Sequence, residues 1–249
     1  MPVNNRIADA QPEIVGWRQH LHQRPELLYE VHETAAFVAG KLRDFGCDEV
    51  ITGMGRTGVV GLVHGRSGAG GPMIGLRADM DALPITEETG VAYASKVPGM
   101  MHACGHDGHT TMLLAAGRSL CETRAFDGTV ALIFQPAEEG GAGAKAMIED
   151  GLFERLPLSR VYGMHNLPGM PVGRFGMRGG PIMASTDEFV ITVDGRGGHA
   201  ALPHRTVDPI VIGAAIVQGL QAIVARNADP LQSLVVSVTQ FHAGFAHNV

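Results

Sequence analysis

The sequence has few cysteines, little charge and no recognisable export signal. Its three cysteines, at positions 47, 104 and 121, are too few for a disulfide-rich scaffold, and their odd number is typical of a reducing compartment such as the cytoplasm. Charged residues make up only 18% of the chain, which excludes an intrinsically disordered protein. Residues 1–13 contain no basic stretch followed by an apolar one, so they do not predict a secretory signal.

The sequence also lacks clustered positive charge and a long uninterrupted apolar run. Lysine and arginine number 19 against 25 aspartates and glutamates, which gives a formal charge of −6. Nucleic-acid binding needs concentrated positive charge, so we expect no nucleic-acid partner. The most apolar segment, residues 209–225, is interrupted by Gln218 and Gln221. We therefore expect a buried helix there rather than a membrane span, and no membrane partner.

Glycine and histidine, by contrast, are abundant. The chain has 34 glycines among 249 residues, nearly twice the usual share of about 7%. It has 12 histidines, and His102, His106 and His109 are clustered in one short segment. Many tight turns and a histidine cluster indicate an enzyme whose site is built from loops on a rigid frame.

Short apolar runs bounded by glycine and proline alternate with amphipathic stretches over most of the chain. This alternation predicts an α/β domain with a mostly parallel sheet. The predicted strands are residues 59–63, 73–76, 129–134 and 161–164, and the predicted helices are residues 7–28, 33–45, 110–120 and 144–148.

The pattern changes after Gly179-Gly180-Pro181. Residues 188–193 and 234–241 have the character of strands, and a long apolar helix is predicted over residues 207–226. We therefore predict two domains: an α/β domain over residues 1–184 and a smaller α+β domain over residues 185–249.

Potential metal ligands follow the predicted strands. Asp79 and Asp81 follow the strand at 73–76, Glu138 and Glu139 follow the strand at 129–134, and His165 follows the strand at 161–164. In open α/β sheets, ligands bind beyond the carboxyl ends of the strands. We therefore expect these side chains to lie along one edge of the sheet.

Each of these residues alone also has a purely structural explanation. An aspartate can cap a turn, adjacent glutamates can form a solvated pair, and a lone cysteine is often a small buried hydrophobe. The segment His102-Ala-Cys104-Gly-His106 is harder to explain in this way. A cysteine protease would pair Cys104 with a distant histidine and would leave His106 and the two glutamates without a role. Thiolate, imidazole and carboxylate groups together predict a site for Zn²⁺ or a similar divalent ion.

One glycine-rich motif does not support a nucleotide site. Residues 53–58 match the spacing of a dinucleotide-binding loop, but they are followed by a predicted strand. The dinucleotide motif requires a helix at that point, so we interpret residues 53–58 as a hairpin turn.

Six motifs occur in order along the chain: WRQHLHQRPEL (17–27), LRADMDALP (76–84), MHACGHDGHT (101–110), FQPAEEGGAGA (134–144), GMHNLP (163–168) and GRGGHAALPH (195–204). On these motifs the chain resembles the M20 metallopeptidase family. The resemblance is to its amidohydrolase branch of hippurate hydrolases, N-acyl-amino-acid amidohydrolases and auxin-conjugate hydrolases. It implies a di-metal α/β hydrolase domain with an inserted α+β lid domain through which homodimers form.

The resemblance also implies roles for individual residues. The positions that correspond to metal ligands are Cys104, His106, Glu139 and His165. Glu138 corresponds to the general base and Asp81 to an acidic residue that orients the site, while Asp79 lies nearby with a less defined role. In the second domain, His199 corresponds to a histidine that reaches the substrate, in dimeric members from the neighbouring subunit. Asn248 corresponds to a substrate-binding asparagine.

The implied activity is that of a cytoplasmic, metal-dependent amidohydrolase. It would use two divalent ions, zinc by default with manganese, cobalt or nickel as alternatives. A metal-bound water would attack the amide bond of N-acyl amino acids such as hippurate or acetyl-amino acids. Neither the acyl group nor the amino acid is specified by the motifs.

Two alternatives stay open. Family members extend beyond residue 249 and carry a further histidine ligand there, for which His242 and His247 are poor substitutes. We therefore expect a C-terminally incomplete chain, and one alternative is a non-catalytic fragment. The other is a dipeptidase or carboxypeptidase of the same broad family. It is less favoured because those relatives usually have an aspartate where this chain has Cys104.

Overall fold

The computed structural model describes residues 5–249, and their contacts form two compact units. The first unit ends at Gly173, and the second comprises Arg174–Val249. The domain boundary predicted after residue 184 stays a prediction. The two units are described separately below.

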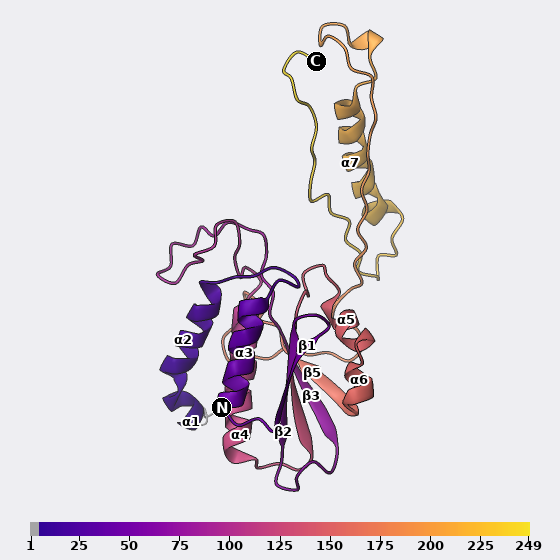
Figure 1. The fold of residues 1–249 in the computed structure, drawn as a ribbon. Coiled ribbons are helices and arrows are strands. Elements are labelled where there is room, and N and C mark those ends of the chain that lie inside the picture. Colours follow the sequence, from indigo (N-terminus) through magenta and orange to yellow (C-terminus); the bar gives the residue numbers. More distant parts are fainter. Residues whose placement is uncertain (1–4) are drawn as a thin grey trace. The chain divides into compact units, whose positions relative to one another are not determined.

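Residues 5–173 of the first unit form six helices and five strands (Figure 1). The helices are α1 (Asn5–Asp9), α2 (Gln11–His22), α3 (His32–Asp44), α4 (His106–Thr123), α5 (Gly143–Glu149) and α6 (Leu152–Arg155). The strands are β1 (Glu49–Met54), β2 (Gly58–His64), β3 (Met73–Asp79), β4 (Thr129–Gln135) and β5 (Leu158–Gly163). The predicted strands and helices of this unit are confirmed, except that one helix predicted over residues 7–28 is two helices ending at His22. β1 and α6 were not predicted.

The five strands form one mixed sheet in the order β1-β2-β4-β3-β5. β3 pairs in parallel with β4 and β5, whereas β2 pairs antiparallel with β1 and β4. The expectation of a mostly parallel sheet is therefore not confirmed. The reason lies in the β1–β2 connection, because only antiparallel strands can be joined by so short a turn. The interpretation of residues 53–58 as a hairpin turn is confirmed.

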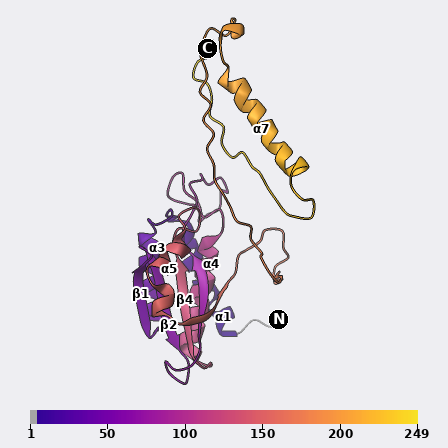
Figure 2. The same cartoon turned by 90° about the vertical axis from the view of Figure 1, so that its right-hand side faces the viewer.

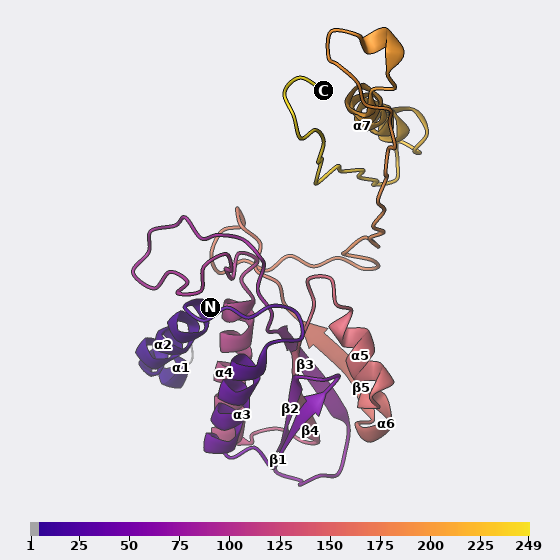
Figure 3. The same cartoon turned by 45° about the horizontal axis from the view of Figure 1, so that its top comes forward.

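Helices cover both faces of this sheet (Figure 3). α3 contacts β1 and β2 and α4 contacts β3 on one face, while α5 contacts β4 on the other. The central strand β4 is buried along its whole length. Its side chains contribute to two hydrophobic clusters, one on each face of the sheet. Its Val130, Leu132 and Phe134 belong to the cluster with α3 and α4, and Ala131 and Ile133 belong to the cluster with α5 and α6. This alternation follows from the two-residue period of a strand.

The parallel part of the sheet positions the candidate site. Because β3, β4 and β5 run in the same direction, their carboxyl ends lie along one edge. The predicted convergence of segments 79–81, 138–139 and 165 on this edge is therefore confirmed at the level of the backbone. β5 is the outermost of the three strands, and most of it is exposed.

The second unit contains a 3₁₀ turn at Pro203–Arg205 and one long helix, α7 (Pro209–Arg226) (Figure 2). Asp208 caps α7 by accepting hydrogen bonds from the backbone N–H groups of Ile210 and Val211. The predicted helix is thus confirmed. The predicted strands at 188–193 and 234–241 are not, because neither segment forms a backbone ladder within residues 174–249.

The apolar side chains of α7 are largely exposed within this unit. Gly213 is its one buried residue, and the ring of Phe241 lies against it. The expectation of a buried helix is therefore not confirmed. Among residues 5–249, α7 is also the one helix whose length and composition would suffice to cross a membrane, which alone is weak evidence.

Candidate metal centre

His106 is presented by the N-terminus of α4. The preceding residue, Gly105, caps the helix with a φ of 100°, in the left-handed region that favours glycine. A Cβ atom at this position would lie 2.5 Å from Oδ1 of Asn166, so a side chain here would also force Asn166 to shift. The glycine-rich loop therefore brings α4 close to the segment that follows β5.

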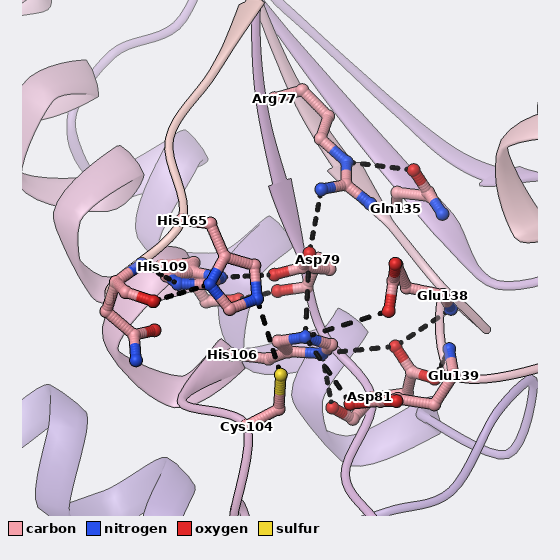
Figure 4. A network of polar contacts seen from close by, with 12 residues as sticks. Arg77, Asp79, Asp81, Cys104, His106, His109, Gln135, Glu138, Glu139 and His165 are labelled. Atoms are coloured by element: carbon pink, nitrogen blue, oxygen red, sulfur yellow. Dashed lines mark hydrogen bonds and ion pairs between the residues drawn. The ribbon is translucent and has the colours of Figure 1, made fainter. Parts of the chain in front are cut away.

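The ring of His106 is fully buried and fixed in orientation (Figure 4). Its Nδ1–H donates to the backbone carbonyl of Asp81 at 2.8 Å. Nε2 then faces three carboxylates, at 3.6 Å from Asp79, 3.9 Å from Glu138 and 3.7 Å from Glu139. A histidine held through Nδ1 by a backbone carbonyl is a typical arrangement for metal binding through Nε2.

His165 is held in the same way on the opposite side of the cluster. Its Nδ1–H donates to the carbonyl of Asn166 at 2.6 Å, and its Nε2 lies 3.3 Å from Sγ of Cys104. Cys104, His106 and His165 form a group whose ligand atoms all lie within 4.8 Å of one another. Predicted residues from two separate segments of the chain are thus brought together.

Asp81 fixes the two glutamates through their backbone. Its carboxylate oxygens accept the N–H groups of Glu138 and Glu139, each at 3.0 Å. The side chains of Glu138 and Glu139 are 41% and 20% exposed, so the first is the more accessible. Both lie with His106 in a second group of potential ligands. Asp81 is therefore placed to orient this pair.

Asp79 and His109 form a chain of hydrogen bonds that was not predicted. Nδ1–H of His109 donates to Asp79 at 2.7 Å, and its Nε2 accepts the backbone N–H of Asn166 at 3.0 Å. Arg77 donates to the other oxygen of Asp79 at 2.7 Å. His109 thereby links β3 to the segment that carries His165. The sequence signal that could have identified His109 is its spacing, since a residue three positions after His106 lies on the same face of the helix.

The electrostatics of the cluster favour positive charge. Burial would raise the pKa of Asp79, but the hydrogen bond from His109 and the charge of Arg77 lower it to about 2. Burial would lower the pKa of His106, yet the carboxylate of Asp81 beside Nδ1 and the other nearby carboxylates raise it. Burial, and then the charge of Glu139, raise the pKa of the Cys104 thiol to about 12. Without a cation, the cluster therefore disfavours a further negative charge.

Two unsatisfied atoms indicate that these residues fit a cation. Nε2 of His106 and Oε1 of Glu139 are buried and make no hydrogen bond within the described part of the chain. Buried polar atoms normally have a partner, so such exceptions require an explanation. A divalent ion would satisfy both atoms, and the thiol, imidazole and carboxylate donors suit zinc and related metals.

The N-terminal motif at residues 17–27 supports the same helix end. His22 contacts Asp107 through Nδ1 at 2.9 Å and Glu87 through Nε2 at 3.2 Å. Arg18 donates to the same oxygen of Asp107 at 3.0 Å. This motif therefore ties α2 to the first turn of α4, directly beside His106.

The remaining predicted residues lie in the second unit. Nδ1 of His199 accepts the backbone N–H of Ala201 at 3.1 Å, and the backbone carbonyl of Asn248 accepts the N–H of Ala200 at 3.0 Å. Because Ala200 directly follows His199, this second hydrogen bond places Asn248 close to His199 within that unit. Because Nδ1 is an acceptor, a neutral His199 ring carries its proton on Nε2.

The fold and the site together define an α/β protein with candidate metal ligands at the carboxyl ends of its parallel strands. Residues 75–246 match the model of peptidase family M20/M25/M40. The chain belongs to this family, as its motifs had indicated.

Similar proteins extend the comparison. The chain is 49% identical to a hippurate hydrolase of Campylobacter jejuni over 98% of this chain and 62% of that protein. It is 46% identical to an N-acetyl-L-cysteine deacetylase of Bacillus subtilis over 100% of this chain and 58% of that protein. A solved structure of a dinuclear metal-binding peptidase of the M20 family from Bacillus subtilis has a TM-score of 0.68 at 36% identity, covering 88% of this chain and 57% of that one. The chain thus spans about 60% of the length of these curated relatives.

Proposed function

We propose that this protein is a metal-dependent amidohydrolase that cleaves the amide bond of N-acyl amino acids. The observation that carries the proposal is the convergence of Cys104, His106, Glu139 and His165, with unsatisfied ligand atoms on His106 and Glu139. The names of the similar hydrolase and deacetylase support the substrate class, which includes hippurate-like and acetyl-amino-acid compounds.

We assign these four residues to two divalent cations, with zinc as the default and manganese, cobalt or nickel as alternatives. The separate ligand groups around His106 and the dinuclear relative support two ions. Such ions, when bound, lower the pKa of water toward about 7 and polarise a substrate carbonyl. His106 and His165 would bind through Nε2, since a backbone carbonyl holds Nδ1 of each ring.

Glu138 acts as the general base in this proposal. Its exposed carboxylate accepts a proton from the attacking water and then transfers it to the nitrogen of the leaving amine. Proton transfer by a positioned side chain contributes typically about 10²–10⁴-fold to the rate. Asp81 is a positioning residue, because it holds the peptide N–H groups of both glutamates.

The residues of the second unit complete the proposal. A neutral His199 can donate from Nε2 to the oxyanion of the tetrahedral intermediate, because its Nδ1 is occupied as an acceptor. Asn248 would bind the substrate. We further propose a cytoplasmic homodimer that associates through this unit; its apolar, exposed helix α7 supports such an association.

Paired substitutions of the two glutamates test the assignment. Glu138→Gln should lower kcat by about 10²–10⁴-fold and leave the bound metal unchanged, because it removes the base only. Glu139→Gln should lower the metal content itself. Hydrolysis of hippurate and acetyl-amino acids is measured beside the metal content by elemental analysis. Full activity of Glu138→Gln, or one metal ion per chain at saturation, would contradict the respective assignment.

The same assay separates the alternatives. A chain that binds cations with the expected ligand dependence but hydrolyses no amide would be the non-catalytic form. Cleavage of dipeptides in preference to N-acyl amino acids would favour the dipeptidase or carboxypeptidase instead. Indole-acetyl conjugates extend the substrate panel to bulkier acyl groups.

A further inference from the structure

Two cysteines that the proposed metal centre does not use lie next to each other in the first unit. Sγ of Cys47 lies 3.6 Å from Sγ of Cys121, although the two residues are 74 positions apart in the sequence. Cys121 is 9% exposed and packs in the core beside α3, while Cys47 is half-buried. Cys47 is therefore the more exposed of the two residues.

The backbone around both sulfurs is fixed by the ends of two helices. After α3, the chain turns at Gly46 (φ 80°), and the N–H of Cys47 donates to the carbonyl of Leu42 at 3.1 Å. Arg124, at the C-terminus of α4, donates to the carbonyl of Gly46 at 2.9 Å and to Asp48 at 2.8 Å. The residues on both sides of Cys47 are thus bound to the helix that carries Cys121.

We propose that Cys47 and Cys121 form a redox-active dithiol, which small-molecule disulfides oxidise to an intramolecular disulfide between the α3–β1 turn and α4. The sulfurs need to approach by only about 1.5 Å to reach the bond length of about 2.05 Å. The hydrogen bond with Cys121 and burial raise the pKa of Cys47, and the charge of Arg124 opposes this rise, whereas the same hydrogen bond lowers the pKa of Cys121.

The reaction is a two-step thiol–disulfide exchange. The thiolate of Cys47 attacks one sulfur of the small disulfide, whose S–S bond breaks and releases one small thiolate. The thiolate of Cys121 then attacks Sγ of Cys47 in the mixed disulfide and displaces the second small thiolate. Both released thiolates take up protons, so two protein thiols are oxidised and one small disulfide is reduced to two thiols.

This site is separate from the proposed metal centre. Cys121 lies near the C-terminal end of α4 and His106 at its first residue, which a helical rise of about 1.5 Å per residue places about 22 Å apart. Because the two sites are far apart, oxidation should not change the metal content. The disulfide restricts the unfolded chain, so oxidation should raise the thermal unfolding midpoint by roughly 5–10 °C. This readout distinguishes the dithiol from oxidation of Cys104.

Peptide mapping of the full chain tests the proposal. The reduced protein is incubated with oxidised glutathione, quenched with N-ethylmaleimide in denaturant, digested without reduction and analysed by mass spectrometry. We expect most molecules to contain a peptide pair linked through Cys47 and Cys121. Recovery of both residues in alkylated form, or of Cys47 as a stable glutathione adduct in the wild-type chain, would overturn the proposal.

Two serine variants serve as matched controls. Cys121→Ser should retain glutathione on Cys47, because the second displacement is no longer available. Cys47→Ser should leave Cys121 unmodified, because that thiol is buried. In neither variant should oxidation raise the unfolding midpoint. The wild-type peptide map decides the proposal by itself if a serine variant does not fold.

Discussion

At the scale of single residues, hydrogen bonds to the backbone determine where the ligand atoms point. His106 and His165 each donate Nδ1–H to a main-chain carbonyl, and Asp81 accepts the main-chain N–H groups of both glutamates. The contacts made by Asp81 join loops far apart in the sequence, whereas His165 bonds to its neighbour Asn166. The orientation of the candidate ligands therefore depends on their neighbours as much as on the ligands themselves.

His109 provides a test of this dependence. His109→Leu removes the donor to Asp79 and the acceptor for the N–H of Asn166, so the segment with His165 loses its anchor. We expect metal affinity, measured by equilibrium dialysis, to fall by about 10–100-fold. His64→Leu is the control, because it removes another histidine hydrogen bond, to Thr129, away from the site. Equal metal affinity in the two variants would refute the positioning role.

At the scale of elements, the start of α4 is a constrained connection that positions a candidate ligand. Gly105→Ala forces a side chain into a left-handed conformation and against Asn166. We expect a loss of about 1–3 kcal/mol in urea unfolding, together with weaker metal binding. Gly108→Ala, one helical turn later, meets nothing within 4 Å and should be neutral or stabilising by about 0.5–1 kcal/mol. Similar losses in both variants would show that the constraint at Gly105 is absent.

The turn between α3 and β1 should show a defined pH dependence. Burial raises the pKa of Asp48, but hydrogen bonds from Arg124 and the N–H of His64 lower it below its usual range. The carboxylate thus stabilises the fold above its unfolded pKa of about 3.9, and this contribution disappears as the pH falls through the lowered value. Asp48→Asn should therefore cost about 1 kcal/mol at pH 7 and progressively less below pH ~4. Asp44→Asn, at an exposed position of α3, is the control. A constant difference across this pH range would argue against the ionised contact.

Most elements of the first unit could be predicted from the sequence because they are encoded locally, whereas β1 and α6 were not predicted. A continuous apolar run such as residues 129–134 and the glycine at 46 mark a buried strand and a helix end without reference to the rest of the chain. The mixed sheet could not be predicted, because the order and relative direction of its strands depend on which strands pair in the folded protein. Similarly, Cys104, His106, Glu139 and His165 are recognisable by chemical type, whereas the contact of His109 with Asn166 depends on tertiary packing.

The strands predicted in the second unit show the limit of local pattern. The alternation over residues 188–193 identifies a segment compatible with a sheet, but a strand forms only where a neighbour accepts its hydrogen bonds. No such ladder is present within residues 174–249. The apolar surface of α7 follows from the same lack of packing partners in this unit.

At the scale of the whole molecule, cation binding should stabilise the first unit. All four candidate ligands belong to it, and so does Trp17, the single tryptophan, which is 5% exposed in its core. Zinc at 100 times its dissociation constant should add about 2.7 kcal/mol. Tryptophan fluorescence should then report a midpoint higher by roughly 5–10 °C. Glu139→Gln should abolish most of this shift, and an unchanged wild-type midpoint at saturating zinc would contradict cation binding.

The position of β5 at the border of the sheet has a practical consequence. An edge strand has unpaired backbone N–H and C=O groups on its outer side, and these can pair with a strand of another chain. His165 follows this strand directly, so self-association there would bury a candidate ligand and alter the apparent affinity for metal. Titrations repeated over a range of protein concentrations, with light scattering alongside, would separate intrinsic binding from this concentration-dependent effect.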